Sequence, residues 1–233
     1  MKPLAARVAG IVRAPRVTFA DLCTVSRPPW VDALALSTLL IFASLATLLS
    51  TSVGQIALVD QWERTAIAFG QPVDDALYLR FQELSTHWLA YSAGTAVLTG
   101  PLLAGVITGI VILVLRFAGQ RPRVATVLSL VAHASIILGF RQLIAAPVNY
   151  VGESLASPTT FVQLLASVDE TSPLARFLGV VDIFIVWWAV ILAVGVATVA
   201  HRRVRPVALA FTGVYLAIAL LLALAMAATG GTA

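Results

Sequence analysis

Long runs of apolar residues, separated by short polar segments, account for most of the chain. A helix that crosses about 30 Å of hydrocarbon needs roughly 20 mostly apolar residues. Five runs reach that length, and we predict membrane spans at about residues 31–54, 86–116, 124–150, 174–200 and 206–228. The pattern therefore predicts an all-α fold, a polytopic transmembrane helical bundle. The first run is too long and starts too late for a signal peptide, so we expect a retained span.

The segment of residues 1–30 predicts short amphipathic helices at the cytoplasmic membrane surface. Four apolar residues share one helical face: Leu4, Val8, Ile11 and Val12. This pattern is typical of a helix in the headgroup layer. Pro15 ends that helix, and Thr18 followed by Asp21 resembles a capping box that starts a second one. Trp30 is suited to anchor the chain at the interface. The alternative is a partly ordered basic tail.

The polar interruption at 55–85 predicts an outer loop that contains a short surface helix. Its apolar residues recur at helical spacing: Ile56, Val59, Trp62, Ala66 and Phe69. Such a helix would rest on the outer membrane surface. The loop at 151–173 has Pro158 and scattered serine and threonine residues, and it predicts only a connector.

The second run is too long for one straight crossing. An unbroken helix over 86–116 would span about 46 Å, and Gly100 with Pro101 at its centre predicts a kink. Small residues recur at four-residue spacing in this run and in the fourth: Gly105 and Gly109, then Ala189, Ala193 and Ala197. Such stripes let helices approach closely, either within the chain or between two copies. A broken helix can also line a transport site.

Composition agrees with membrane insertion. Hydrophobic residues make up 60% of the 233, charged residues only 11%, and the mean hydropathy is +0.96. That leaves too little polar surface for a water-soluble globule of this size. The single cysteine, Cys23, excludes an internal disulfide, and we expect it to be a small apolar residue. The net charge of +4 comes from arginines beside apolar runs without interleaved aromatics, so we expect no nucleic-acid partner.

Basic residues predict the orientation of the spans. Those before the first span are Lys2, Arg7, Arg13, Arg16 and Arg27; those between later spans are Arg116, Arg121, Arg123, Arg202, Arg203 and Arg205. The positive-inside rule puts all of them in the cytoplasm if the amino terminus is inside. The other side then receives mostly acidic residues: Asp60, Glu63, Asp74, Asp75, Glu83, Glu153, Asp169 and Glu170, against Arg64, Arg80 and Arg176. Five spans place the carboxyl terminus outside, most simply in a bacterial inner membrane.

Two ionisable residues fall within the apolar runs, Arg141 and Asp182. A charge at this depth is costly unless it is paired or hydrated. Counted along their helices, both lie about 12 to 14 Å below the outer boundary. Matched depth predicts an intramembrane charge pair, which either fixes the register of two helices or forms a polar site for a ligand or lipid headgroup.

No catalytic signature is found in the sequence. His87, His133 and His201 lie at different predicted depths, so they cannot share a metal ion. Patterns for phosphate loops, zinc proteases, nucleophile elbows and dinucleotide-binding turns are missing. Asp74 with Asp75 reads as a solvated surface pair. We therefore expect no catalytic residues, no metal and no cofactor.

Three stretches resemble the bacterial branch of the Yip family, whose eukaryotic members are named for binding Ypt/Rab GTPases. They are IVRAPRVTFADLCTVSRPPWVDAL, GQRPRVATVLSLVAHASIILGF and LGVVDIFIVWWAVILAVGVATVAHRR. The first has proline, then Thr-Phe, then leucine before the Pro-Pro-Trp at the mouth of the first span. The second resembles the family's short basic loop that leads into the third span. The third has an L-x-x-x-D-x-F-x-x-W element. The segment at 55–85 matches no familiar pattern.

The resemblance implies a non-catalytic membrane scaffold or interaction protein, whose partners are the lipid bilayer and other membrane proteins or a second copy. Membrane organisation and trafficking are the processes it suggests. It does not carry over the GTPase partner, because eukaryotic relatives have a long cytosolic amino-terminal domain and this chain has about 30 residues there. The alternative is a small transporter, channel or lipid-binding protein that uses Arg141 and Asp182. An enzyme comes third.

Overall fold

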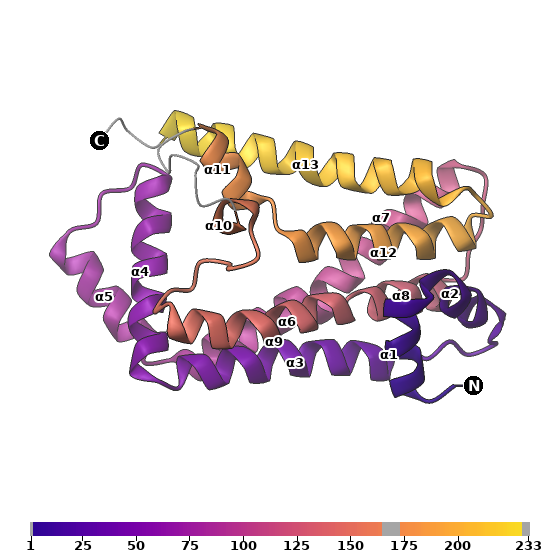
Figure 1. Ribbon diagram of the computed structural model, residues 1–233, viewed down its shortest axis with the longest axis horizontal. Coiled ribbons are helices and arrows are strands. Elements are labelled where there is room, and N and C mark those ends of the chain that lie inside the picture. The colour runs from indigo at the N-terminus through magenta and orange to yellow at the C-terminus, as the bar shows by residue number, and fades with distance from the viewer. Residues whose placement is uncertain (1, 165–172, 230–233) are drawn as a thin grey trace. The chain divides into compact units, whose positions relative to one another are not determined.

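The computed structural model describes residues 2–164 and 173–229, which are helical nearly throughout (Figure 1). The helices are α1 Leu4–Arg13, α2 Pro15–Thr24, α3 Val31–Leu49, α4 Ser52–Ala68, α5 Asp75–Ser85, α6 Trp88–Val97, the π-helical turn η1 Leu98–Leu102, α7 Leu103–Phe117, α8 Val124–Ala134, α9 Ile136–Val151, α10 Phe161–Leu164, α11 Pro173–Val180, α12 Ile183–Val199 and α13 Val204–Thr229. Thr160 and Asp182 form an isolated antiparallel bridge, and the described residues contain no strand. Asp169 and Glu170 lie outside the described residues.

Several helices are long and apolar enough to cross a membrane. In the described part of the chain they are Val31–Leu49, Trp88–Phe117, Val124–Val151 and Val204–Ala225. The apolar helix α12 has 17 residues, which is just short of a full crossing. The predicted all-α polytopic architecture is confirmed. The count of five spans stays a prediction.

The first span ends earlier than its apolar run. Helix α3 stops at Leu49, and α4 begins at Ser52 rather than continuing the predicted span to residue 54. Thr51 lies at the junction, where its Oγ1 accepts a hydrogen bond of 3.1 Å from the amide of Gly54. This cap satisfies one of the free amides at the start of α4. Hydropathy does not detect such a junction because both sides of it are apolar.

The fourth run forms two helices instead of one over residues 174–200. Val181 and Asp182 separate α11 from α12. The backbone of this break pairs with the chain around Thr160: the amide of Phe161 donates to the carbonyl of Val181 at 2.9 Å. The amide of Ile183 donates to the carbonyl of Thr159 at 3.0 Å. The backbone groups that a continuous helix would satisfy therefore find partners in another segment.

The second run contains an irregular turn where the kink was expected. The π-helical turn η1 carries Pro101, which has no amide hydrogen to give to an α-helical ladder. Gly100 is buried there, and a Cβ at this position would collide with the side chain of Thr38 on α3. Glycine allows the two helices to approach closely at this point, and a larger residue would force the side chain of Thr38 to shift.

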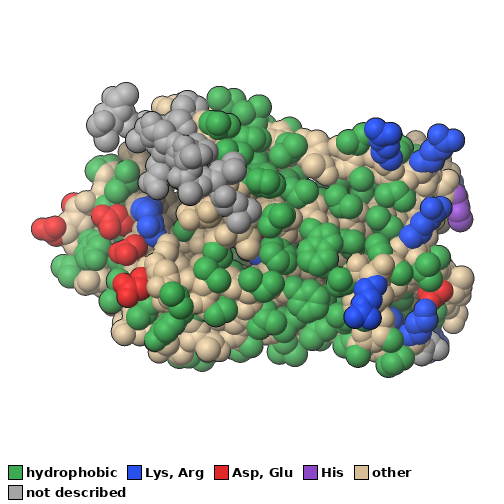
Figure 2. Space-filling model, viewed as in Figure 1, with side chains coloured by type: hydrophobic (Ala, Val, Ile, Leu, Met, Phe, Trp, Pro, Cys, Tyr) green, Lys and Arg blue, Asp and Glu red, His purple; other side chains and the backbone are tan. Residues whose placement is uncertain are grey.

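The chain divides into two compact units. Unit 1 comprises residues 1–41, 95–140 and 184–214, and unit 2 comprises residues 42–94, 141–183 and 215–233. Eleven of the 15 Lys and Arg residues belong to unit 1, whereas nine of the 11 Asp and Glu residues belong to unit 2. In Figure 2 the basic side chains of unit 1 gather around α1, α2 and the start of α13, and acidic side chains of unit 2 lie over α4 and α5.

The amino-terminal helices of unit 1 pack against protein. Ile11, Phe19 and Leu22 are at most 2% exposed and join a core shared with α7, α8 and α12. The prediction that Thr18 starts the second helix is wrong. Helix α2 begins at Pro15, whose fixed φ suits a first helical position. Thr18 lies inside α2, where its hydroxyl donates to the carbonyl of Ala14 at 3.2 Å.

Unit 2 has its own small core. It combines the end of α3 with α4 and α6 through Leu45, Leu49 and Leu58. Trp62 of α4 contacts the ring of Tyr91 edge-on, with ring centroids 5.6 Å apart. The aromatic residues of the segment at 55–85 thus help to bury its helices.

Candidate functional site

A buried ion pair joins α9 to the break between α11 and α12. Arg141 Nε donates to Asp182 Oδ2 at 2.7 Å. The side chain of Asp182 is 2% exposed and that of Arg141 is 25% exposed. Both residues belong to unit 2. We call them, together with Ser157, Thr159 and Tyr215, the Arg141 cluster.

Two hydroxyl groups also bond to the Asp182 carboxylate. Ser157 Oγ and Thr159 Oγ1 each donate to Asp182 Oδ2 at 2.7 Å. Arg141 Nη2 in turn donates to Ser157 Oγ at 2.8 Å. One carboxylate oxygen thus accepts three hydrogen bonds, one of them from a cation. Such charge-assisted bonds are about twice as strong as neutral ones and offset the cost of burying the charge.

Tyr215 ties the backbone of the break to α13. Its hydroxyl accepts a hydrogen bond of 2.9 Å from the amide of Asp182 and donates one of 2.8 Å to the carbonyl of Val180. These are backbone groups that the interruption between α11 and α12 removes from a helical ladder. The tyrosine therefore stabilises the irregular backbone that presents Asp182 to Arg141.

A second polar cluster lies in unit 1 around Arg7, which is only 4% exposed. Its guanidinium forms an ion pair with Asp32 in the first turn of α3. Its Nε also donates to the carbonyl of Lys2 at 3.2 Å, and its Nη1 to that of Pro29 at 3.3 Å. Helix α1 is thereby attached to the entry of the first span. We call Arg7, Asp32 and His133 the Arg7 cluster.

His133 on α8 is the third member of the Arg7 cluster. Its Nε2 lies 2.7 Å from Arg7 Nη1, and its Nδ1 lies 2.7 Å from the carbonyl oxygen of Ser129. A guanidinium can only donate, so Nε2 must accept and Nδ1 must carry the hydrogen that Ser129 accepts. The imidazole is completely buried, and this network assigns it the neutral form.

The sequence analysis did not identify most of these residues. It placed Arg7 among the cytoplasmic basic residues of the amphipathic amino-terminal segment, and it interpreted the loop that holds Ser157 and Thr159 as a connector. Partners such as Arg7 and His133 are 126 residues apart, so no local pattern joins them. Two signals were present: a histidine inside the third apolar run, and a hydroxyl-rich stretch at residues 154–160.

The small-residue stripes differ in their surroundings. Ala189, Ala193 and Ala197 are buried within unit 1. Gly105 and Gly109 on α7 are exposed, and a Cβ added at either would meet no described atom within 4 Å. The glycine pair is therefore not a packing seam between the described helices of the chain.

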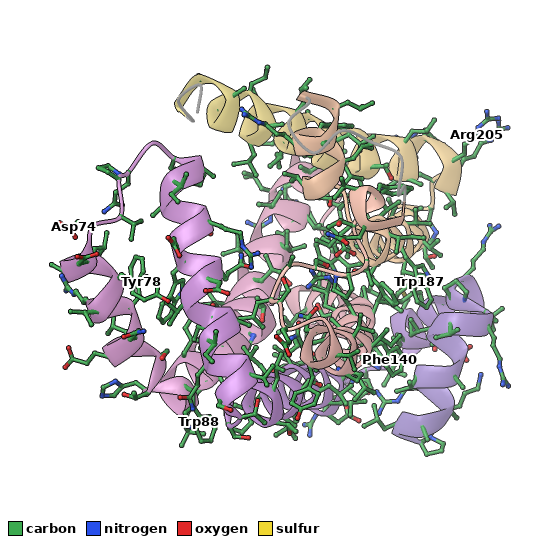
Figure 3. All side chains as sticks on the ribbon, turned by 60° about the vertical axis from the view of Figure 1, so that its left-hand side comes forward. Asp74, Tyr78, Trp88, Phe140, Trp187 and Arg205 are labelled. Atoms are coloured by element: carbon green, nitrogen blue, oxygen red, sulfur yellow. The ribbon has the colours of Figure 1, made fainter. Side chains whose placement is uncertain are left out.

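The aromatic residues of unit 1 lie close to its core. Trp30 is half-buried against Ala33 and Ala132 at the start of α3. Phe140 and Trp187 lie among closely packed side chains, whereas Arg205 extends away from them (Figure 3). The interfacial role predicted for Trp30 stays a prediction.

These observations define a multi-pass, all-α membrane protein whose buried ionisable groups are engaged within the protein. The chain belongs to the Yip1 domain family, because the family model described as Yip1 domain matches residues 9–227. Comparison with curated proteins and with solved structures gives no match. The matched range runs from α1 into α13 and includes His133, Arg141 and Asp182.

Proposed function

We propose that this protein is a non-catalytic membrane scaffold or interaction protein that acts in membrane organisation or trafficking. The observation that carries the proposal is that the Arg7 and Arg141 clusters are satisfied by groups of the chain itself. Arg141, Ser157 and Thr159 all bond to the Asp182 carboxylate. Polar groups occupied in this way hold helices together rather than offer a path to an ion or solute. Membership of the Yip1 family supports the same reading.

We further propose five spans, with the amino terminus in the cytoplasm and the carboxyl terminus outside, in a bacterial inner membrane. Unit 1 holds most of the basic residues, and this supports its placement on the cytoplasmic side. The test is the accessibility of single cysteines, introduced after Cys23 is replaced by alanine, to a membrane-impermeant maleimide in intact cells. Arg80→Cys on α5 is expected to react, and Arg205→Cys only after the membrane is permeabilised.

A second candidate function is a small transporter, channel or lipid-binding protein that uses Arg141 and Asp182. The quarter exposure of the Arg141 side chain favours it, because a cation that is partly open could meet an anionic solute or headgroup. The charge pair would then have a functional role in addition to a structural one.

Affinity capture from native membranes with lipids retained, read by mass spectrometry, separates the two functions. A protein recovered in constant ratio to both wild type and Asp182→Asn supports the scaffold. A solute or lipid that is lost specifically in Asp182→Asn supports the second candidate and contradicts the first. Asp75→Asn, a carboxylate neutralised on the exposed face of α5, is the matched control.

A substitution in the exposed glycine pair of α7 tests where a protein partner binds, without changing the Arg141 cluster. Gly105→Ile adds a bulky side chain where the chain has no described atom nearby, so it should leave the thermal transition unchanged. Loss of the captured protein in this variant would place another membrane protein or a second copy against α7. Unchanged capture would assign the partner to a different face.

A further inference from the structure

Three separate segments of unit 1 are drawn together at the loop between α7 and α8. Gln120 Nε2 in this loop donates to the carbonyl of Ala200 at 2.9 Å, at the end of α12. Arg123 Nη2 donates to the carbonyl of Val25 at 2.8 Å, just after α2. All three segments carry arginines: Arg121 and Arg123 in the loop, Arg202 and Arg203 after α12, and Arg27 after α2. The loop contacts therefore place basic residues from distant parts of the sequence beside one another.

Most of these arginines have no acid to neutralise them. Unit 1 contains two acidic residues, Asp21 and Asp32, and they form ion pairs with Lys2 and Arg7. Within the described residues, the remaining arginines of unit 1 have no carboxylate within 4.0 Å: Arg13, Arg16, Arg27, Arg116, Arg121, Arg123, Arg202, Arg203 and Arg205. Such a concentration of positive charge attracts anions to this surface.

The loop between α7 and α8 is hollowed into a pocket of about 500 Å³. Its lining consists of Arg116, Gly119, Gln120, Arg121 and Pro122. Gly119 adopts a φ of 80°, which a residue without a side chain reaches at no cost, and it turns the chain at the end of α7. This turn puts two exposed arginine residues in the lining of one pocket. Their planar arrays of donors match the oxygens of a phosphate group.

Two exposed apolar residues lie at the ends of the loop that forms the pocket. Phe117 follows Arg116 directly and is 85% exposed, and Val124 at the start of α8 is 54% exposed. A soluble phosphate would make no use of these exposed hydrophobic side chains. A phospholipid presents both chemistries, a phosphate for the arginines and hydrocarbon for Phe117 and Val124.

We propose that Arg116 and Arg121 form a headgroup site for an anionic phospholipid, with Phe117 and Val124 against its glycerol and upper acyl region. Lipids with net negative charge are selected because their phosphate lacks the choline cation that would be repelled by the surrounding arginines. The proposed site requires only that the chain is a membrane protein. A failed lipid test would therefore leave the scaffold function intact, and a failed scaffold test would leave the lipid site intact.

The test measures lipid retention by native mass spectrometry after reconstitution in nanodiscs with equal amounts of phosphatidylglycerol and phosphatidylcholine. The wild type is expected to retain phosphatidylglycerol preferentially. Arg116→Gln with Arg121→Gln should reduce that preference by about tenfold or more. The matched control is Arg16→Gln with Arg205→Gln, which removes the same charge from exposed positions outside the pocket and should keep the preference within about twofold.

Three results would overturn the proposal. One is an equal loss of the phosphatidylglycerol preference in both double variants, because the preference would then come from the overall positive charge and not from a specific site. Another is a wild type without preference. The third is displacement of phosphatidylglycerol by millimolar inorganic phosphate but not by sodium chloride of equal ionic strength, which would assign the pocket to a soluble phosphate. If the glutamine pair fails to fold, Arg116→Lys with Arg121→Lys keeps the charge, loses the paired donors and should still weaken retention.

Discussion

Neutralising Asp182 is the sharpest test of the Arg141 cluster. Asp182→Asn keeps the size of the side chain but removes the charge that balances Arg141. Removing one partner from a buried ion pair costs 3 to 5 kcal/mol, and because the Arg141 side chain is 25% exposed, water compensates part of this. We expect the free energy of unfolding to fall by about 2 kcal/mol and the thermal midpoint by about 4 to 8 °C.

The measurement is unfolding from mild detergent by titration with sodium dodecyl sulfate, followed by tryptophan fluorescence. A double-mutant cycle with Asp182→Asn, Arg141→Gln and the double variant isolates the interaction energy between the two side chains. We expect a coupling energy of about 2 kcal/mol, well above the roughly 0.6 kcal/mol of an average hydrogen bond between membrane helices. The control Asp75→Asn should change stability by no more than about 0.5 kcal/mol. Purely additive losses would refute the energetic pairing.

Three other perturbations have equally definite outcomes. Gly100→Val should destabilise the protein by about 1 to 3 kcal/mol, because its side chain collides with α3, while Gly105→Val, which meets no described atom, should be nearly neutral in the same titration. Arg7→Gln should cost about 2 kcal/mol and speed limited proteolysis of the amino terminus, since α1 loses its bonds to the entry of α3. Burial raises the pKa of the Cys23 thiol, so less thiolate is present at any given pH. Alkylation of Cys23 should therefore be slower than that of free cysteine, and the midpoint of its rate against pH should lie at higher pH. Denaturation should remove both differences.

Long apolar runs predicted the middle helices closely. The expected spans 86–116 and 124–150 correspond to Trp88–Phe117 and Val124–Val151. The hydropathy of such a run is an average over about 30 residues, so a few substitutions would not remove it. The irregular turn at Gly100 and Pro101 was also predictable, because a proline in the interior of a helix has no amide hydrogen to give to the helical ladder.

Breaks that depend on distant partners were not predictable. The sequence analysis placed Asp182 inside a continuous span, because hydropathy averages over neighbours and one carboxylate barely lowers it. The break forms because the backbone there bonds to Thr159 and Phe161, and because Tyr215 takes up two further groups. Each of these interactions joins residues at least 20 positions apart. Together these interactions decide the local structure, and no short window of the sequence contains all the residues that make them.

The cation in both clusters is an arginine, and the chemistry of arginine indicates what the clusters do. Arg7 and Arg141 each face one carboxylate and additional neutral acceptors or donors. A guanidinium cannot lose its proton in a protein, unlike a buried lysine or histidine. Neither cluster can therefore be released by deprotonating its arginine. Permanent cations matched to carboxylates are suited to holding helices in a fixed register, which is what the proposed scaffold requires.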